Sequence, residues 1–193
     1  MCGRYYVDRD MEDELEKVIH EIDRKMREEC QGRDVYPTNR APVIENTANG
    51  LGLSIQKWGY PAPQGKGVII NARSESVLDR PMFRQGIRYH RIVIPARGFY
   101  EWNREKEKST FTRFDSPLMY MAGFYDRFEN ESRFVILTTE ANGSMIKVHD
   151  RMPLILEENQ LEQWFDGDRM EEILRQTPTL LQRTVEYEQQ SLF

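Results

Sequence analysis

The chain has 193 residues, of which 39% are hydrophobic and 31% are charged, with a formal net charge of −5 at pH 7. No run approaches the roughly 20 apolar residues of a membrane helix, and the N-terminal MCGRYYVDRD lacks the apolar core of a secretory signal. Two cysteines, Cys2 and Cys30, are too few for a disulfide scaffold, and together with three histidines they leave few metal ligands. We therefore expect a reduced, cytoplasmic protein without a metal, an organic cofactor or a membrane partner.

The charges are distributed unevenly along the chain. Residues 8–34 carry 6 Lys+Arg against 11 Asp+Glu, residues 71–114 carry 10 against 5, and residues 155–193 carry 3 against 9. The overall charge argues weakly against a nucleic-acid partner, but the distribution is more informative than the total. From charge alone, chance clustering on solvated faces explains the pattern as well as a binding surface does.

A helix and then an extended segment are predicted first. Apolar residues from Leu15 to Met26 recur at i, i+3, i+4, i+7 and i+11, which places them on one face of an amphipathic helix over 11–29. Pro37 and Pro42 then favour an extended loop, because a proline also restricts the residue before it.

Short β-type segments dominate the rest of the chain. Runs rich in β-branched and aromatic residues, separated by Gly, Pro, Asn and Asp, predict strands. These runs are 51–58, 67–70, 91–95, 98–102, 110–114, 118–125, 133–139, 153–156 and, in the tail, 179–187. Two short helices are predicted at 158–165 and 168–175. The pattern indicates one α+β domain over 1–193, with a largely antiparallel, curled sheet.

Cys2 is informative because of its position. Methionine aminopeptidase usually removes an initiator Met that precedes a small residue, so the mature chain would begin with Cys2. Its α-amine and its thiol, with reference pKa values of about 8 and about 8.5, are both partly nucleophilic near neutrality. Such an aminothiol attacks aldehydes, since the amine forms a Schiff base and the thiol closes a five-membered thiazolidine. The same residue would also suit an N-terminal-nucleophile amidohydrolase, or it is an ordinary terminal cysteine.

Glu101 and His149 are candidate proton carriers. Glu101 follows a run of apolar and aromatic residues, and a carboxyl at a partly dry strand end is suited to general acid–base work. His149 is followed by Asp150 and Arg151 just before a predicted strand, and imidazole is the natural proton shuttle near neutral pH. Taken singly, they are more readily explained as a surface glutamate and a structural histidine.

Polar residues occupy every second position after the predicted strand 67–70. Asn71, Arg73 and Glu75 would share one face if that strand continues, and an amide beside a guanidinium fork suits an anionic or sugar-like ligand. A plain surface Arg–Glu pair is the alternative.

Aromatic residues accompany the basic middle segment, as in proteins that hold single-stranded nucleic acid by stacking, although several must belong to the core. They are Trp58, Tyr60, Phe83, Tyr89, Phe99, Tyr100 and Trp102.

Read together, five ordered motifs resemble one family, the SOS-response-associated peptidase (SRAP) family of abasic-site processing proteins. The motifs are MCGRY at the N-terminus, WGY at 58–60, INARSES at 70–76, IPARGFYEW at 94–102 and VHDRMPLIL at 148–156. The resemblance implies an α+β fold around a mostly antiparallel, barrel-like sheet. It also implies recognition of abasic sites in single-stranded DNA, at stalled forks or single-strand/double-strand junctions.

The resemblance further implies a role for each matching residue. Cys2 would form the thiazolidine crosslink that shields the lesion, once Met1 is removed autocatalytically or by the aminopeptidase. Asn71 would position the sugar, Glu101 would act as acid–base, and His149 would assist ring opening or crosslink reversal. The DNA-contacting residues would be Arg4 and Arg73, which hold phosphates, and Trp58 and Tyr60, which lie where the family places a wedge that splits the duplex.

Two other functions remain open at this point. One is a cysteine-type peptidase or N-terminal-nucleophile amidohydrolase that uses Cys2 and His149. The other is a DNA-binding or modified-base-binding module in which Cys2 is incidental. The substrate separates them, because only crosslinking demands an aldehyde and gives a covalent product. For the protein itself we expect a monomer.

Overall fold

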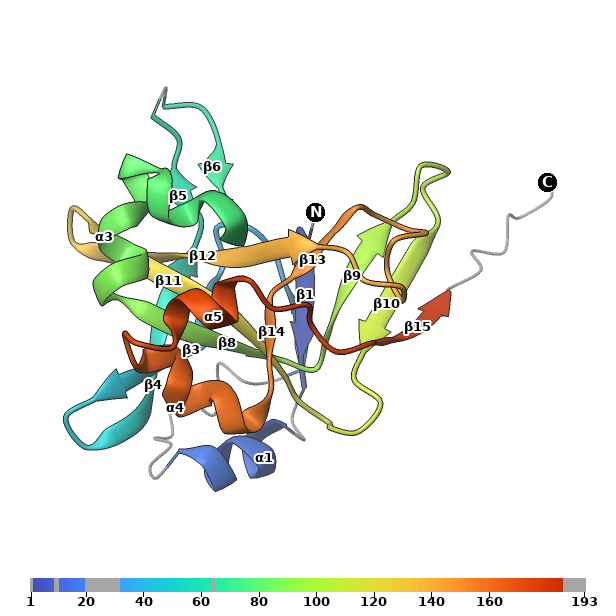
Figure 1. Ribbon diagram of the computed structural model, residues 1–193. Helices are drawn as coiled ribbons and strands as arrows, with labels where there is room; N and C mark the ends of the chain where they lie inside the picture. The colour runs from blue at the N-terminus through green and yellow to red at the C-terminus, as the bar shows by residue number, and fades with distance from the viewer. Residues whose placement is uncertain (1, 9–10, 20–31, 64, 186–193) are drawn as a thin grey trace.

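A closed five-stranded barrel forms the centre of the protein. The computed structural model describes residues 2–8, 11–19, 32–63 and 65–185 (Figure 1). Strand β4 pairs with β3, β3 with β8, β8 with β11, β11 with β12, and β12 with β4 again. The closing β12–β4 pair is parallel and the other four pairs are antiparallel. The strands are β3 Arg40–Thr47, β4 Gly50–Trp58, β8 Arg91–Ala96, β11 Met119–Phe128 and β12 Glu131–Glu140. The prediction of a mostly antiparallel, barrel-like α+β fold is therefore confirmed.

A second sheet of five strands stands beside the barrel in the order β15-β10-β9-β1-β2. Its strands are β1 Arg4–Val7, β2 Arg33–Val35, β9 Gly98–Trp102, β10 Lys108–Thr112 and β15 Gln182–Val185. Alternate residues face inward, so that Tyr5, Phe99 and Phe111 are fully buried, while Tyr6 and Tyr100 stack on the outer face with ring centroids 5.3 Å apart. The two sheets share one continuous core.

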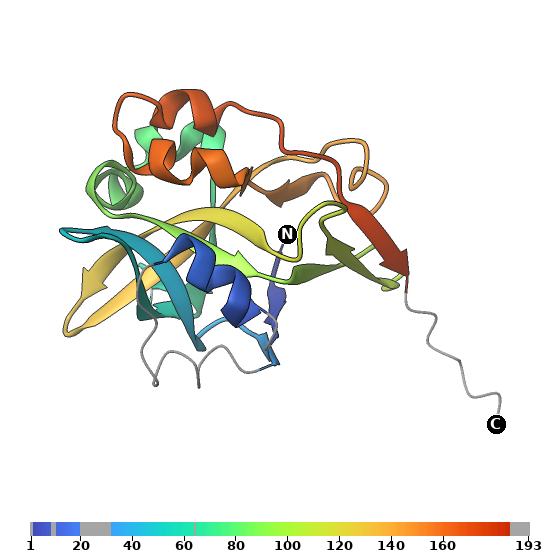
Figure 2. The same ribbon diagram turned by 90° about the horizontal axis from the view of Figure 1, so that it is seen from below.

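Short strands and helices cover the remaining surfaces. The strands are β5 Tyr60–Pro61, β6 Val68–Ile69, β7 Asn71–Arg73, β13 Arg151–Pro153 and β14 Ile155–Leu156. The helices are α1 Met11–Val18, η1 Ser74–Asp79, α3 Pro81–Tyr89, η2 Glu158–Gln160, α4 Leu161–Phe165 and α5 Met170–Leu174. Helix α1 lies at the opposite end of β1 from the N-terminus (Figures 1 and 2). None of the helices described is long and apolar enough to cross a membrane.

Most predicted elements are present, with shifted ends. The amphipathic helix is confirmed over Met11–Val18, and its continuation through 20–29 lies outside the described residues. The predicted loop around Pro42 is wrong, because this segment is strand β3 and Pro42 pairs with Ile55 of β4. The strand predicted at 153–156 is interrupted at Leu154, whose N–H donates to the carbonyl of Leu137. Of the predicted tail strand, Gln182–Val185 is observed, and 186–187 lie outside the described residues.

Gly98 is required where β9 passes between β10 and β1. A Cβ at this position would lie 2.4 Å from the Phe111 carbonyl oxygen and 2.9 Å from the ring of Tyr6. We expect Gly98→Ala to lower the free energy of unfolding by at least about 2 kcal/mol, because backbone must move to admit the methyl group. Gly143→Ala is the control, since nothing lies within 4 Å of its Cβ position. Urea unfolding of both variants measures the difference, and equal stability would contradict the close approach.

Candidate active site

Cys2 lies at the end of the chain that enters β1, and its main chain is held by a side chain 69 residues away. Asn71, the first residue of β7, donates from Nδ2 to the Cys2 carbonyl oxygen at 3.1 Å. The Cys2 side chain is fully buried, and its Sγ lies 3.9 Å from the carbonyl oxygen of Arg4. This contact between the first and third motifs fixes the position of Cys2.

Glu101 lies on the inner face of β9, close to Cys2. The pairing of Arg4 with Tyr100 brings Glu101 beside the residue that follows Cys2. The residue is only 6% exposed, and its carboxylate accepts a hydrogen bond from the Trp102 N–H at 3.4 Å. Burial, and then the negative charge of Glu101, raises the pKa of the Cys2 thiol. The thiol is therefore protonated at neutral pH.

His149 is held in a defined tautomer. The backbone N–H of Arg151 donates to His149 Nδ1 at 2.9 Å, so the neutral ring carries its proton on Nε2. Asp150 Oδ1 also lies 2.9 Å from Nδ1, an ion pair that forms only if that nitrogen is protonated. The two contacts are alternatives, and the one to Arg151 belongs to the neutral imidazole. The His149 side chain is partly exposed, at 28%.

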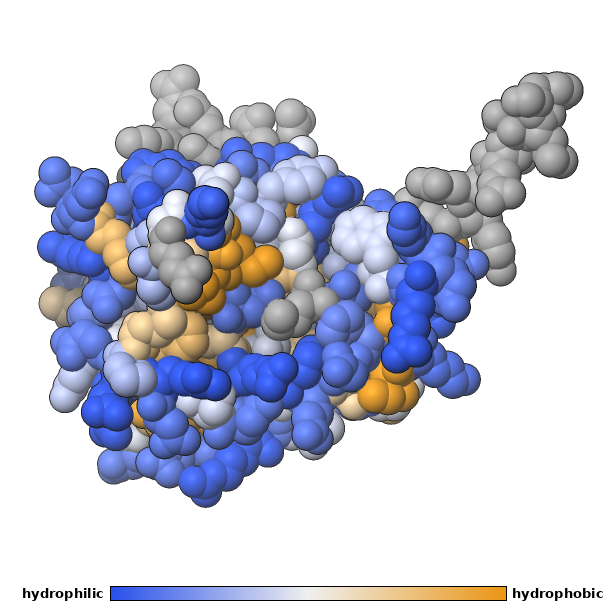
Figure 3. Space-filling model, turned by 90° about the horizontal axis from the view of Figure 1, so that it is seen from above, coloured by the Kyte–Doolittle hydropathy of each residue, from blue (hydrophilic) through white to orange (hydrophobic). Residues whose placement is uncertain are grey.

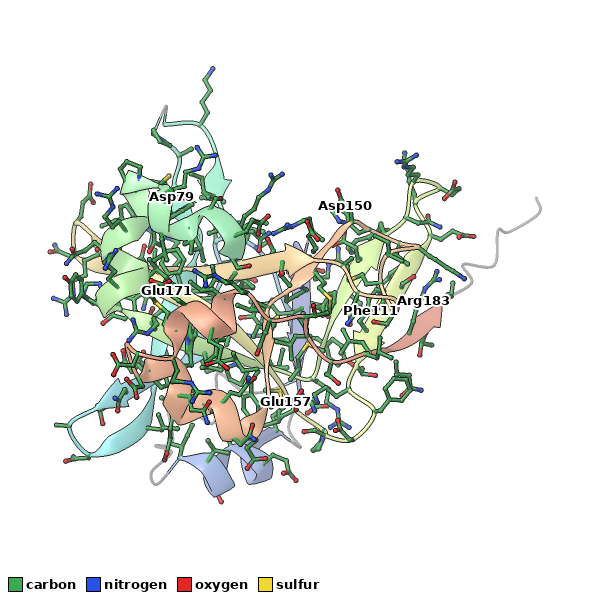
Figure 4. All side chains as sticks on the ribbon, in the orientation of Figure 1. Asp79, Phe111, Asp150, Glu157, Glu171 and Arg183 are labelled. Carbon is green, nitrogen blue, oxygen red and sulfur yellow. The ribbon has the colours of Figure 1, made fainter. Side chains whose placement is uncertain are left out.

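A groove lies beside His149 and Trp102, the residue that follows Glu101. One depression of about 590 Å³ is lined by Trp102 and His149, and a second of about 370 Å³ by Arg73 and Arg151. Ile146 and Asp150 line both, so the two depressions adjoin. On the face seen in Figure 3 a hydrophobic area is enclosed by hydrophilic surface, and Figure 4 shows Asp150 directly before strand β13. The groove therefore joins segments from three of the five motifs, those at 70–76, 94–102 and 148–156.

Arg151 anchors the segment that carries His149. Its guanidinium donates to both carboxylate oxygens of Glu75, at 2.6 and 2.9 Å, and to the Thr138 carbonyl oxygen at 2.7 Å. Bidentate pairing of this kind fixes orientation as well as distance. The expectation that Glu75 continues the strand face of Asn71 is wrong, because β7 ends at Arg73 and Glu75 lies in η1.

Arg4 and Arg73 are placed differently around the site. Arg73 is exposed at the end of β7. The Arg4 guanidinium lies 4.5 Å from the ring centroid of Tyr36 and 5.0 Å from that of Trp102, and 3.6 Å from Asp34. Sequence reasoning missed this cage of aromatic rings, although the alternation in GFYEW already placed Tyr100 and Trp102 on one face.

Trp58 and Tyr60 do not form an exposed wedge, which corrects the prediction. Both are fully buried. Trp58 Nε1 donates to the Ile70 carbonyl at 3.0 Å, and its ring lies 6.3 Å from that of Phe134. Tyr60 packs against Phe128 with ring centroids 4.8 Å apart. Neither ring offers a surface on which a base could stack, so these residues belong to the core.

The protonated state of the Cys2 thiol predicts slow alkylation. Only the thiolate reacts with iodoacetamide, and a raised pKa moves its formation to higher pH. In a Cys30→Ser background, we expect the alkylation rate to keep rising well above pH 9, and to be much slower at pH 7.5 than in the urea-unfolded chain. Intact mass spectrometry measures both rates. A plateau near pH 8.5 in the folded protein would contradict the burial of this thiol.

The sequence is similar to those of known proteins over most of its length. The family model described as SOS response associated peptidase (SRAP) matches residues 1–191. The chain is 30% identical over 180 residues to "Abasic site processing protein YoaM" of Bacillus subtilis, covering 86% of this chain and 79% of that one. It is 29% identical over 175 residues to "Abasic site processing protein YedK" of Escherichia coli, covering 85% and 79%.

Solved structures show the same fold. A protein of Bacteroides thetaiotaomicron superposes with a TM-score of 0.80 at 21% identity, over 95% of this chain and 91% of that one. A phage-related protein of Bordetella bronchiseptica superposes with a TM-score of 0.78 at 24% identity, over 97% and 95%. From the match over residues 1–191 and the identity to YoaM, the chain belongs to the SRAP family.

Proposed function

We propose that this protein recognises abasic sites in single-stranded DNA and captures the ring-opened sugar covalently through Cys2, after loss of Met1. The observation that carries the proposal is the convergence of Cys2, Asn71 and Glu101, together with the groove that His149 and Trp102, the residue after Glu101, line. Relatives over most of the chain are named abasic site processing proteins, which supports DNA with abasic sites as the partner.

The chemistry needs proton transfers at two places. An abasic sugar is mostly a closed hemiacetal, so its ring oxygen must gain a proton while its anomeric hydroxyl loses one. As an imidazolium whose Nδ1–H faces Asp150, His149 can give its Nε2 proton to the ring oxygen, and the Nε2 lone pair left on the neutral ring can take the proton of the anomeric hydroxyl. The Glu101 carboxylate can take a proton from the Cys2 ammonium. The amine then adds to the aldehyde and expels water to give a Schiff base. Addition of the neutral thiol across the C=N bond, with its proton going to nitrogen, closes the thiazolidine.

The raised pKa of the Cys2 thiol supports a reaction in which the amine attacks first and the thiol closes the ring afterwards. A peptidase nucleophile needs a thiolate, usually made by a histidine within hydrogen-bond reach. Burial opposes thiolate formation at Cys2, and within the described part of the chain no hydrogen bond joins His149 to Cys2. The arrangement therefore favours attack by the amine first, and it disfavours a Cys–His peptidase acting on other proteins.

Intact mass spectrometry tests the proposal. Met1-free protein is incubated with an oligonucleotide that carries a natural abasic site, and the expected product has the mass of protein plus DNA minus one water. The control oligonucleotide carries a tetrahydrofuran analogue, which has no anomeric hydroxyl and cannot open to an aldehyde. Absence of the adduct, or an equal adduct with the analogue, would refute aldehyde capture.

A further inference from the structure

The outer face of helix α3 carries a row of arginines that the capture chemistry does not use. Arg80, Arg84 and Arg88 are all exposed, and they recur at i, i+4 and i+8. Residues at this spacing lie on one helix face, and like charges there destabilise an isolated helix. Within the described part of the chain, no acidic side chain forms an ion pair with any of the three. We call these three residues the α3 arginine face.

The arginines that flank another helix, α5, do form ion pairs, which makes the unpaired arginines of α3 unusual in this protein. On α5 and its N-cap, Arg169 pairs with Glu172 at 2.9 Å and Arg175 with Glu171 at 3.1 Å. The nearest acidic residue in the chain before α3 is Asp79. It lines a hollow of about 510 Å³ together with Arg84 and Arg88, but it lies beyond ion-pair distance of both. The α3 arginine face therefore presents unneutralised positive charge.

The face is also rigid and connected to the groove. Arg73 is the N-cap of η1, and Arg80 is both the C-cap of η1 and the N-cap of α3. On the opposite side of α3, a Cβ at Gly86 would lie 2.5 Å from the Phe124 ring and 2.8 Å from the Tyr125 carbonyl oxygen, so the helix packs closely on β11. One short helix thus links the groove-lining Arg73 to the α3 arginine face, and η1 and α3 lie side by side in Figure 1.

We infer that the α3 arginine face binds the phosphates of the DNA that flanks the abasic nucleotide. From Arg80 to Arg88 the helix advances about 12 Å, at about 1.5 Å per residue. One strand of a duplex carries about three to four phosphates over that length. Tyr89, 71% exposed at the end of the same helix, adds a stacking surface. The inference rests on the proposed function for the identity of the DNA.

The test compares two charge-matched variants, Arg84→Gln/Arg88→Gln and the control Arg169→Gln/Arg175→Gln at the two caps of α5. Affinity is measured at several salt concentrations for a short and for a long single strand, each with a central tetrahydrofuran analogue. We expect the α3 variant to lower the slope of log K against log salt by about 1.4 on the long strand, at about 0.7 per lost phosphate contact. Its affinity for the short strand should equal that of the control variant.

Two results would overturn the inference. One is an α3 variant that matches the control variant on the long strand, and the other is an equal loss on both strands. Because these are binding measurements with an analogue that cannot react, they remain decisive if the protein forms no crosslink. Failure of the inference and failure of the proposed capture are therefore distinguishable.

Discussion

Cys2→Ala is expected to lose the stable crosslink to abasic DNA while keeping a Schiff base that borohydride traps. The variant retains an α-amine at residue 2 but has no thiol to close the ring. Cys2→Ser should behave in the same way toward borohydride. Denaturing gels with and without borohydride, read beside intact masses, separate the transient adduct from the stable one.

Blocking the amine provides the matching control. A protein with an uncleaved N-terminal tag keeps the thiol, but its residue 2 nitrogen is an amide and cannot form a Schiff base. We expect neither the stable nor the borohydride-trapped adduct. A blocked protein that crosslinks abasic DNA at the wild-type rate would eliminate the aminothiol mechanism, whatever Cys2→Ala does.

Glu101→Gln is expected to slow crosslinking by about 10²- to 10⁴-fold, the usual contribution of a general acid–base group. The amide nearly matches the carboxylate in shape at a position only 6% exposed, so the structure around Cys2 should be retained. Affinity for DNA with the unreactive analogue should change by less than about 2-fold, because binding does not need the proton transfer. Single-turnover kinetics measure the rate, and a fluorescence titration measures the affinity.

The control variant for this experiment is Glu105→Gln. Glu105 is exposed at the other end of the groove-lining segment that begins at Trp102, and its substitution removes the same charge. It should leave the crosslinking rate within about 2-fold of wild type. Equal rates for the two variants would show that charge near the groove, rather than proton transfer at Glu101, governs the reaction.

The sequence was most informative where periodicity and chemistry coincide. The β-branched runs at 51–58 and 133–139 lie within barrel strands, and the helical pattern from Leu15 begins in α1. Helix α3 was missed because its buried face consists only of Phe83, Gly86 and Ile87, too few apolar residues to produce a visible period. Strand β3 was missed because Pro42, which lies within it, is a residue type that is typical of loops.

The candidate site was predictable only in part, for a physical reason. Asn71 and Cys2 are 69 residues apart, and no local pattern predicts a hydrogen bond across that distance. The resemblance grouped the motif residues without distinguishing side chains that face the groove from those that support it. Trp58 was assigned to DNA contact, although its indole lies between Tyr5 and Phe134 in the core. Burial depends on the closing β12–β4 pair, which brings together residues about 76 positions apart.

The complete burial of Cys2 has a consequence for when the protein becomes competent. An external aminopeptidase must reach the bond between residues 1 and 2, and in the folded chain residue 2 has no exposed surface and its carbonyl is held by Asn71. If Met1 is removed as the proposed mechanism requires, we expect cleavage by such an enzyme to occur on the nascent chain, before β1 pairs with β9, which is made more than 90 residues later. The proposed capture would then depend on whether trimming of the N-terminus precedes its folding.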